Sequence, residues 1–290
     1  MPLPRPALVF ACVVLAGLGL LGWRLESAWQ ARQAERQAAA ASPSAATAAE
    51  TALPLPPDPP RLSADPEYDR CLAMVRDDPI AALAFAEGWE RAGGGSEAAR
   101  HCIAWALLGL GEPERAADQL ERLALGSRAG ATARAALFGQ AGQAWMMAGQ
   151  ADRAFAAITM ALTLTPRDPD LLVDRAVALA SLNRHAEALP DLEAALAIDP
   201  DRLEALVFRA AALRRLERLA EARQSVERAL ALSPDHPEGL LERGILRQLA
   251  GDEAGARRDW ERVLEVAPGS PAADLAEQNL SLSAAGPSRR

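Results

Sequence analysis

A 34-residue period in the C-terminal half constrains the fold of this chain more than any other feature. Four prolines follow one another at intervals of 34 residues, at Pro166, Pro200, Pro234 and Pro268. Small residues keep the same interval, at Gly142, Ala176, Ala210 and Gly244 and again at Ala154, Ala188, Ala222 and Ala256. Large apolar residues also keep it, at Phe138, Leu172, Leu206 and Leu240 and at Ile158, Leu192, Val226 and Trp260. A fixed period of this length indicates an array of structural repeats.

Each repeat is predicted to be a hairpin of two helices. The small residues let the two helices approach closely where they cross, and the large residues fill the space between neighbouring hairpins. Proline ends the second helix, because it has no N–H and its ring clashes with the preceding turn. Aromatic residues make up only 4% of a chain that is half apolar, which favours packed helices over sheets. Since one hairpin cannot bury its apolar face alone, the hairpins must stack.

This pattern resembles the tetratricopeptide repeat family, through its spacing, its small residues and its closing proline. The fold class implied by the resemblance is all-α, a tetratricopeptide-like solenoid of helix hairpins. Four repeats are predicted in residues 135–270, and two degenerate helix pairs in residues 65–134. Residues 271–282 are predicted to form a capping helix with Leu275, Ala276 and either Leu280 or Leu282 facing inward.

The N-terminal segment is predicted to be a membrane anchor. Residues 7–23 are uncharged and mostly apolar, and their number is the lower limit for a helix that spans a bilayer. Cleavage as a signal peptide is disfavoured, because Trp23 and Arg24 stand where small residues are needed. Residues 1–36 are therefore predicted to form a transmembrane anchor with a short polar helix. A disordered Ala/Pro-rich linker is expected at 37–63 and a disordered tail at 283–290.

The orientation of this anchor has two alternatives. Arg24, Arg32 and Arg36 lie after the span, and a positive flank of this kind favours a cytoplasmic C-terminal side. A very short N-terminal tail is instead typical of anchors that export the C-terminal part of the chain. We prefer export, which places the helical domain in the periplasm at a bacterial inner membrane. A cytoplasm-facing adaptor of a membrane complex remains the alternative.

No sequence motif predicts catalysis. The chain has no HExxH, GxSxG or glycine-rich phosphate loop. Its net charge of −8 argues against nucleic acid as a partner. We therefore predict no enzyme activity, cofactor, metal site or small-molecule substrate. The histidines His101, His185 and His236 are expected at the surface or as helix caps. The pairs Arg214-Arg215 and Arg257-Arg258 are expected on solvated helix faces, and contact with an acidic partner is the alternative for these pairs.

Two cysteines in the degenerate region are a candidate pair. Cys71 and Cys102 are 31 residues apart, close to one repeat, and lie on neighbouring predicted first helices. If the domain is exported, the oxidising compartment allows a disulfide between them. Two buried thiols that act as small core residues are the alternative.

The resemblance implies a binding surface. In the tetratricopeptide family the first helices line a concave face that holds a partner polypeptide. The lysine and asparagine clamp of some members is missing, because this chain has no lysine. The function implied is a membrane-tethered scaffold or assembly factor, with a cytochrome c maturation-type chaperone as a further alternative. The residues implied for the groove are Gln140, Gln143, Met147, Asp174, Val177, Ser181, Phe208, Ala211, Arg215, Glu242, Ile245 and Leu249.

Overall fold

The structure is a computed structural model that describes residues 63–93 and 96–285. The predicted anchor, including the span at residues 7–23, lies outside these residues, as does the linker up to residue 62. Among the described helices, none is both long enough and apolar enough to cross a membrane.

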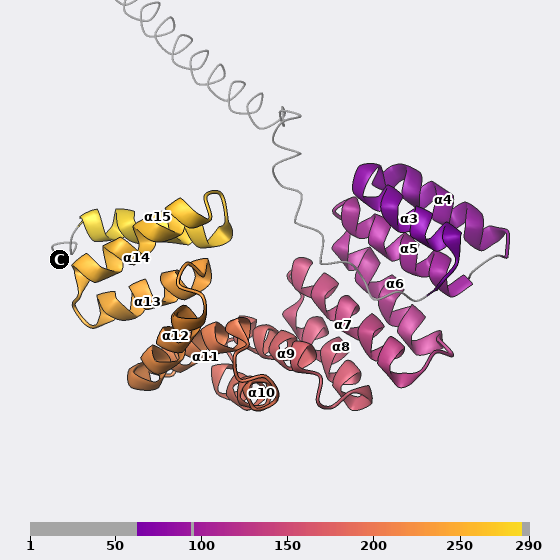
Figure 1. Cartoon of the computed structure of the whole chain (residues 1–290). Coiled ribbons are helices and arrows are strands. Elements are labelled where there is room, and N and C mark those ends of the chain that lie inside the picture. Colours follow the sequence, from indigo (N-terminus) through magenta and orange to yellow (C-terminus); the bar gives the residue numbers. More distant parts are fainter. Residues whose placement is uncertain (1–62, 94–95, 286–290) are drawn as a thin grey trace, which may run out of the picture. The chain divides into compact units, whose positions relative to one another are not determined.

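The described residues form an all-α array of helical hairpins (Figure 1). The helices pair in chain order, so that α3 and α4 form the first hairpin and α13 and α14 the sixth, with α15 at the end. Four of these hairpins carry the 34-residue period, as predicted. The helices are α3 (Pro66–Asp77), α4 (Pro79–Arg91), α5 (Ser96–Gly109), α6 (Pro113–Gly126), α7 (Ala131–Met147), α8 (Ala151–Leu164), α9 (Pro169–Ser181), α10 (His185–Ile198), α11 (Leu203–Arg215), α12 (Leu219–Leu232), α13 (Pro237–Leu249), α14 (Glu253–Val266) and α15 (Pro271–Ala285).

The packing of the hairpins gives the first helices a shared face. Each helix packs against the next one along the chain. The first helices of neighbouring hairpins also contact one another, since α7 touches α9, α9 touches α11, and α11 touches α13. This face is where the functional site lies.

The small residues lie at close contacts inside the hairpins. A Cβ atom on Gly142 would lie 2.3 Å from Ile158 Cγ1, and one on Gly244 would lie 2.3 Å from Trp260 Nε1. Ile158 and Trp260 are fully buried on the second helix of the same hairpin. The period in the sequence therefore corresponds to the crossing of the two helices.

The turn inside each hairpin also repeats. Gly149, Asn183, Glu217 and Gly251 follow one another at the repeat interval, and all four have positive φ, between 60° and 82°. Glycine adopts this left-handed conformation without strain, and asparagine adopts it more readily than other residues. The turn geometry is thus kept although the residue changes.

An ion pair inside the hairpin keeps the same period. The guanidinium of Arg175 donates two hydrogen bonds to Asp191, with Nη2–Oδ1 2.6 Å and Nε–Oδ2 2.7 Å. Arg243 donates in the same way to Asp259, with distances of 2.7 and 3.0 Å. The fifth hairpin departs from this pattern. There Arg209 Nη1 donates to the hydroxyl of Ser225, 2.6 Å away.

Restoring the carboxylate in the fifth hairpin should stabilise it. Ser225 is 2% exposed, so Arg209 has a neutral partner inside the packed hairpin. We expect Ser225→Asp to raise the free energy of unfolding by about 1 kcal/mol, because a pair of opposite charges replaces a hydrogen bond from the guanidinium to a neutral hydroxyl. Urea denaturation of the variant measures the change. Ser225→Asn is the matched neutral control and should give no gain; a loss of stability in Ser225→Asp would contradict the prediction.

The prediction for His101 is wrong. This residue was expected at the surface or as a cap, but it is fully buried in α5. Its Nδ1 accepts a hydrogen bond from the hydroxyl of Tyr68 at 2.7 Å, and its Nε2 donates to Gln140 Oε1 at 2.6 Å. Burial lowers the pKa of His101 to about 4, although the hydrogen bond from Nε2 to Gln140 opposes this shift. The imidazole is therefore neutral at pH 7 and connects α3, α5 and α7.

The capping helix also differs from the prediction. α15 extends to Ala285, three residues past the predicted end. Ala276 is buried and Leu280 packs against the core, but Leu275 and Leu282 are 50% and 63% exposed. Leu275 therefore does not face inward, and Leu280 rather than Leu282 does. The reason is that no second helix comes after α15 in the described residues to cover the face that carries both exposed leucines.

Candidate functional site

Two hollows on the first-helix face bring several predicted groove residues together. The first has a volume of about 160 Å³ and is called the Asp174 hollow. The second has a volume of about 180 Å³ and is called the Phe208 hollow. The Asp174 hollow is lined by Gln143, Met146, Ile158, Asp174 and Val177. The Phe208 hollow is lined by Ala176, Val177, Ala180, His185, Ala188, Leu192, Phe208, Ala211, Ala212, Arg214 and Arg215.

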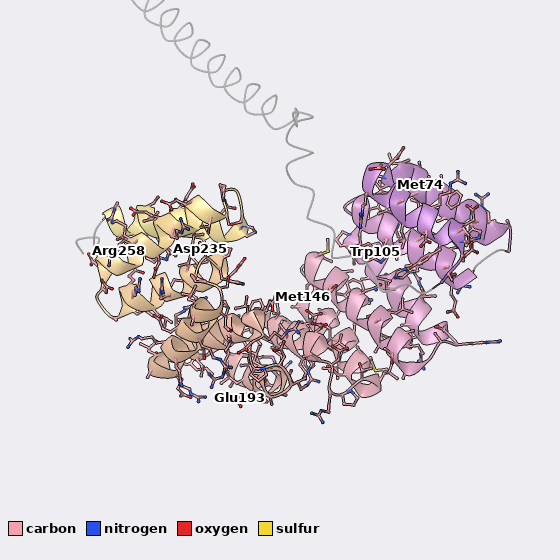
Figure 2. All side chains as sticks on the ribbon, viewed as in Figure 1. Met74, Trp105, Met146, Glu193, Asp235 and Arg258 are labelled. Carbon is pink, nitrogen blue, oxygen red and sulfur yellow. A yellow bond between two sulfur atoms is a disulfide. The ribbon has the colours of Figure 1, made fainter. Side chains whose placement is uncertain are left out.

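Val177 of α9 lines both hollows, so the two are neighbours on this face. Their walls come mainly from the first helices α7, α9 and α11, with parts of α8 and α10 at the base. Met146, labelled in Figure 2, contributes from near the end of α7. We call the two hollows together the first-helix groove. Its lining is mostly apolar, with a few polar groups at defined places, which is the usual character of a binding site.

The polar groups of the Asp174 hollow are an amide and a carboxyl. Gln143 Nε2 donates to Asp174 Oδ2 at 3.0 Å and joins α7 to α9. Burial raises the pKa of Asp174 to about 6, and the hydrogen bond from Gln143 opposes this shift. Asp170 and Asp168 add to the rise through repulsion, and Arg202 counteracts it. Asp174 is therefore ionised at pH 7 but only weakly compensated.

The Phe208 hollow carries positive charge. Arg214 is bound to the buried carboxylate of Glu242, with Nε–Oε1 2.6 Å and Nη2–Oε2 3.1 Å. The sequence prediction of a solvated face is therefore wrong for Arg214, because α11 and α13 contact each other there. Arg215 is exposed and has no hydrogen-bond or ion-pair partner among the described residues. Burial lowers the pKa of His185, and repulsion from Arg215 and Arg214 lowers it further.

His185 also has an unused polar atom. Its Nδ1 is buried and has no hydrogen-bond partner in the described part of the chain. The ring lines the Phe208 hollow beside Phe208, whose side chain is 38% exposed. An exposed aromatic ring, an unpaired guanidinium and an unpaired imidazole nitrogen thus share one wall.

The remaining predicted groove residues lie outside both hollows. Gln140 is engaged with His101, and Glu242 is 5% exposed and engaged with Arg214. The hydroxyl of Ser181 donates to its own helix at Val177 O. Met147 and Ile245 pack partly against the core, and Leu249 is 56% exposed at the end of α13.

The sequence prediction also omitted some lining residues. Met146, Ile158, His185 and Arg214 line the groove but were not among the residues assigned to it. Ile158 and His185 belong to second helices, which the resemblance does not assign to the binding face. Arg214 is adjacent to the predicted Arg215, and both line the Phe208 hollow.

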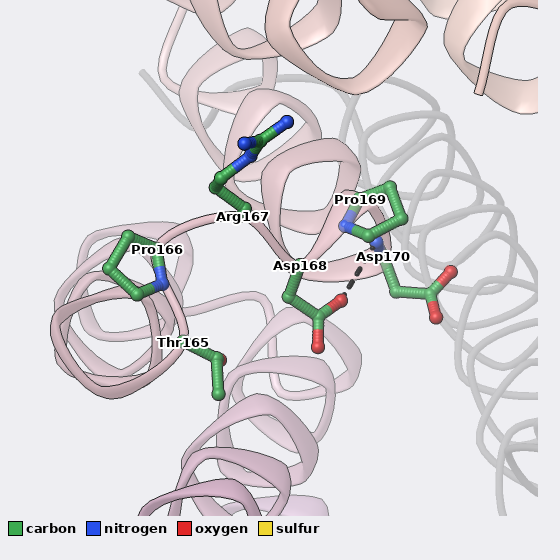
Figure 3. A pocket seen from close by; sticks show the side chains of 6 residues that line it. All are labelled: Thr165, Pro166, Arg167, Asp168, Pro169 and Asp170. Atoms are coloured by element: carbon green, nitrogen blue, oxygen red, sulfur yellow. Dashed lines mark hydrogen bonds between the residues drawn. The ribbon is translucent and has the colours of Figure 1, made fainter. Parts of the chain in front are cut away.

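A third hollow lies at the surface of the turn between α8 and α9. It has a volume of about 690 Å³, and its lining within the described residues is the consecutive stretch 165–170 (Figure 3). The carboxylate of Asp168 accepts from the backbone N–H of Asp170 at 3.0 Å and caps α9, and Pro169 begins that helix. Asp170 pairs with Arg202 from the start of the next hairpin. These contacts have structural roles, so we do not assign the site here.

Metal binding finds no support in the described ranges. Within them, no group of three or more histidine, cysteine, aspartate or glutamate side chains could hold a metal ion.

The fold and the groove define a class of protein, the stacked helix-hairpin arrays that present an extended surface to other polypeptides. The family model of the tetratricopeptide repeat matches residues 143–212 and 209–281. Residues 143–281 of the chain therefore consist of tetratricopeptide repeats. No curated protein matches the chain.

Solved structures show the same fold at low sequence identity. A tetratricopeptide repeat protein from Parabacteroides merdae is 15% identical, with a TM-score of 0.63, and the match covers 76% of this chain and 88% of that one. PilF from Pseudomonas aeruginosa is 17% identical, with a TM-score of 0.58, and the match covers 75% of this chain and 96% of PilF. MamA from Desulfovibrio magneticus is 22% identical, with a TM-score of 0.52, and the match covers 61% of this chain and 98% of the MamA chain.

Proposed function

We propose that this protein is a membrane-tethered scaffold that binds an extended segment of a partner polypeptide in the first-helix groove. The observation that carries the proposal is that two mostly apolar hollows lie side by side on the first helices and share Val177 as a lining residue. Two neighbouring hollows suit successive side chains of a chain segment rather than a compact ligand. Arg215, His185 and Asp174 supply charged and polar groups that could fix its position.

The tether is the segment at residues 7–23, and the proposed location of the helical domain is the periplasm. The Cys71–Cys102 disulfide supports export, because such bonds persist in oxidising compartments. Fusing alkaline phosphatase after Arg61 tests this orientation. Phosphatase activity in intact cells supports export, and its absence, together with fluorescence of a green fluorescent protein fused at the same place, supports the cytoplasm-facing adaptor.

Blocking the groove should remove peptide binding. Ala211 is partly exposed and lines the Phe208 hollow, so an indole in Ala211→Trp should occupy that hollow without entering the core. We expect peptides selected from a phage-displayed random library on the natural protein to lose at least about tenfold in affinity for this variant, or about 1.4 kcal/mol. Fluorescence polarisation of the synthetic peptides measures the loss.

The matched control for this variant is Gln224→Trp. Gln224 is exposed on the second helix α12, away from the groove lining. This variant should bind the selected peptides as the natural protein does. Equal affinity of all three proteins would show that the groove is not the binding site.

A further inference from the structure

The two hollows of the first-helix groove have opposite electrostatic character. The Asp174 hollow offers one carboxyl between the aliphatic side chains of Ile158 and Val177. The Phe208 hollow offers the guanidinium of Arg215 and the ring of His185 beside an aromatic wall. A ligand that fills both hollows must satisfy both kinds of charge.

The Asp174 hollow fits a basic side chain. Gln143 supplies the one hydrogen bond that Asp174 accepts within the described residues, and a half-buried carboxylate with a single neutral donor is poorly compensated. Lysine and arginine bury an apolar stem and present a charged end. The stem would lie against Met146 and Val177, and the charged end would reach Asp174.

The Phe208 hollow fits a carboxylate. Arg214 is already neutralised by Glu242, which leaves Arg215 as the cation available to a ligand. The side chain of His185 lines the same hollow. Phe208, Ala176 and Ala180 surround these groups with apolar surface, which strengthens an ionic contact by excluding water.

We propose that the groove recognises a peptide segment carrying one basic side chain and one carboxylate, with the basic group in the Asp174 hollow and the carboxylate beside Arg215. This inference rests on the proposed peptide-binding function and specifies its ligand. The carboxylate could belong to an acidic side chain or to a chain terminus, and the two sources share the same chemistry at Arg215.

The affinity should depend on pH through Asp174. Its pKa of about 6 in the free protein means that the carboxyl is ionised at pH 7 and is protonated as the pH falls below 6. A bound cation favours the ionised form, so binding lowers this pKa and releases protons near pH 6. The other groups that act on the carboxyl are Gln143 of α7, Asp168, Asp170, and Arg202 before α11.

The experiment uses synthetic peptides on the full chain. The probes are N-acetylated nonapeptides of alanine with one lysine and one glutamate at varied separations and in both orders. Control peptides replace lysine by norleucine or glutamate by glutamine. A further set has a free C-terminal carboxylate in place of glutamate, compared with the amidated form.

The variants separate the two hollows. Peptides with both charges should bind at least about tenfold more tightly than either control. In Asp174→Asn the preference for lysine over norleucine should disappear while the preference for a carboxylate remains, and in Arg215→Gln the reverse should hold. Calorimetry of peptide binding at pH 6, in buffers of different ionisation enthalpy, should show that about half a proton is released for each peptide bound. This proton release should be absent in Asp174→Asn.

The outcomes distinguish this inference from the proposed function. Peptides that lose affinity for Ala211→Trp but show no charge preference overturn the inference and leave the function standing. Peptides that bind Ala211→Trp and the natural protein equally overturn the function as well. Failure of every charged peptide to bind better than alanine nonapeptide also overturns the inference. Preference for the free C terminus over internal glutamate would assign the carboxylate to a chain end.

Discussion

Replacing both Cys71 and Cys102 with alanine should destabilise the N-terminal hairpins by about 3–4 kcal/mol. The structure joins these cysteines in a disulfide between α3 and α5, with Cα atoms 6.2 Å apart and 31 residues between them in sequence. In the chain-entropy account, closing a loop of this length restricts the unfolded chain. Both positions are fully buried, and alanine fits there without strain.

The measurement is hydrogen exchange rather than a single melting temperature, because repeat arrays open locally. Amides of α3 to α6 should lose protection in the alanine variant, while those of α13 and α14 should not. The natural protein treated with a reducing agent is the matched control and should show the same local loss. Unchanged protection in α3 would show that packing alone holds these hairpins.

The period made the fold of the C-terminal half predictable, because repeated residues have repeated roles. The proline positions gave the ends of the second helices, and Gly142 and Gly244 gave the crossings. The pairing of Arg175 with Asp191 and of Arg243 with Asp259 keeps the same interval and could have been found in the sequence. A comparison of the apolar and small positions does not reveal it, because both partners are charged.

Contacts between hairpins were less predictable. The burial of His101 depends on Tyr68, 33 residues before it, and on Gln140, 39 residues after it. No local pattern connects these three residues, since the repeats of this region are degenerate. The pairing of Arg214 with Glu242 also joins neighbouring hairpins. It neutralises Arg214, so that Arg215 is the arginine of this pair that a ligand in the groove can contact. The residues available to a ligand therefore depend on packing as much as on repeat position.

Replacing Ala210 with tryptophan should disrupt the fifth hairpin and cost about 3 kcal/mol or more. Ala210 is fully buried at the position that Gly142 and Gly244 occupy in other hairpins. At those glycines even an added Cβ would lie 2.3 Å from a side-chain atom of the second helix, so an indole has no space without separating the helices. Interiors packed at this density cannot absorb such a volume.

The adjacent substitution Ala211→Trp is the control, because it adds the same ring one residue away on the partly exposed groove side. Circular dichroism should show a lower melting temperature for Ala210→Trp than for Ala211→Trp, and hydrogen exchange should show the loss of protection in α11 and α12. If the two variants melt alike, Ala210 does not lie at the crossing of these helices. In that case the alignment that assigns one face of α11 to the core and the other to the groove would fail too, because a shift of one residue turns the side chains by about 100° around the helix axis.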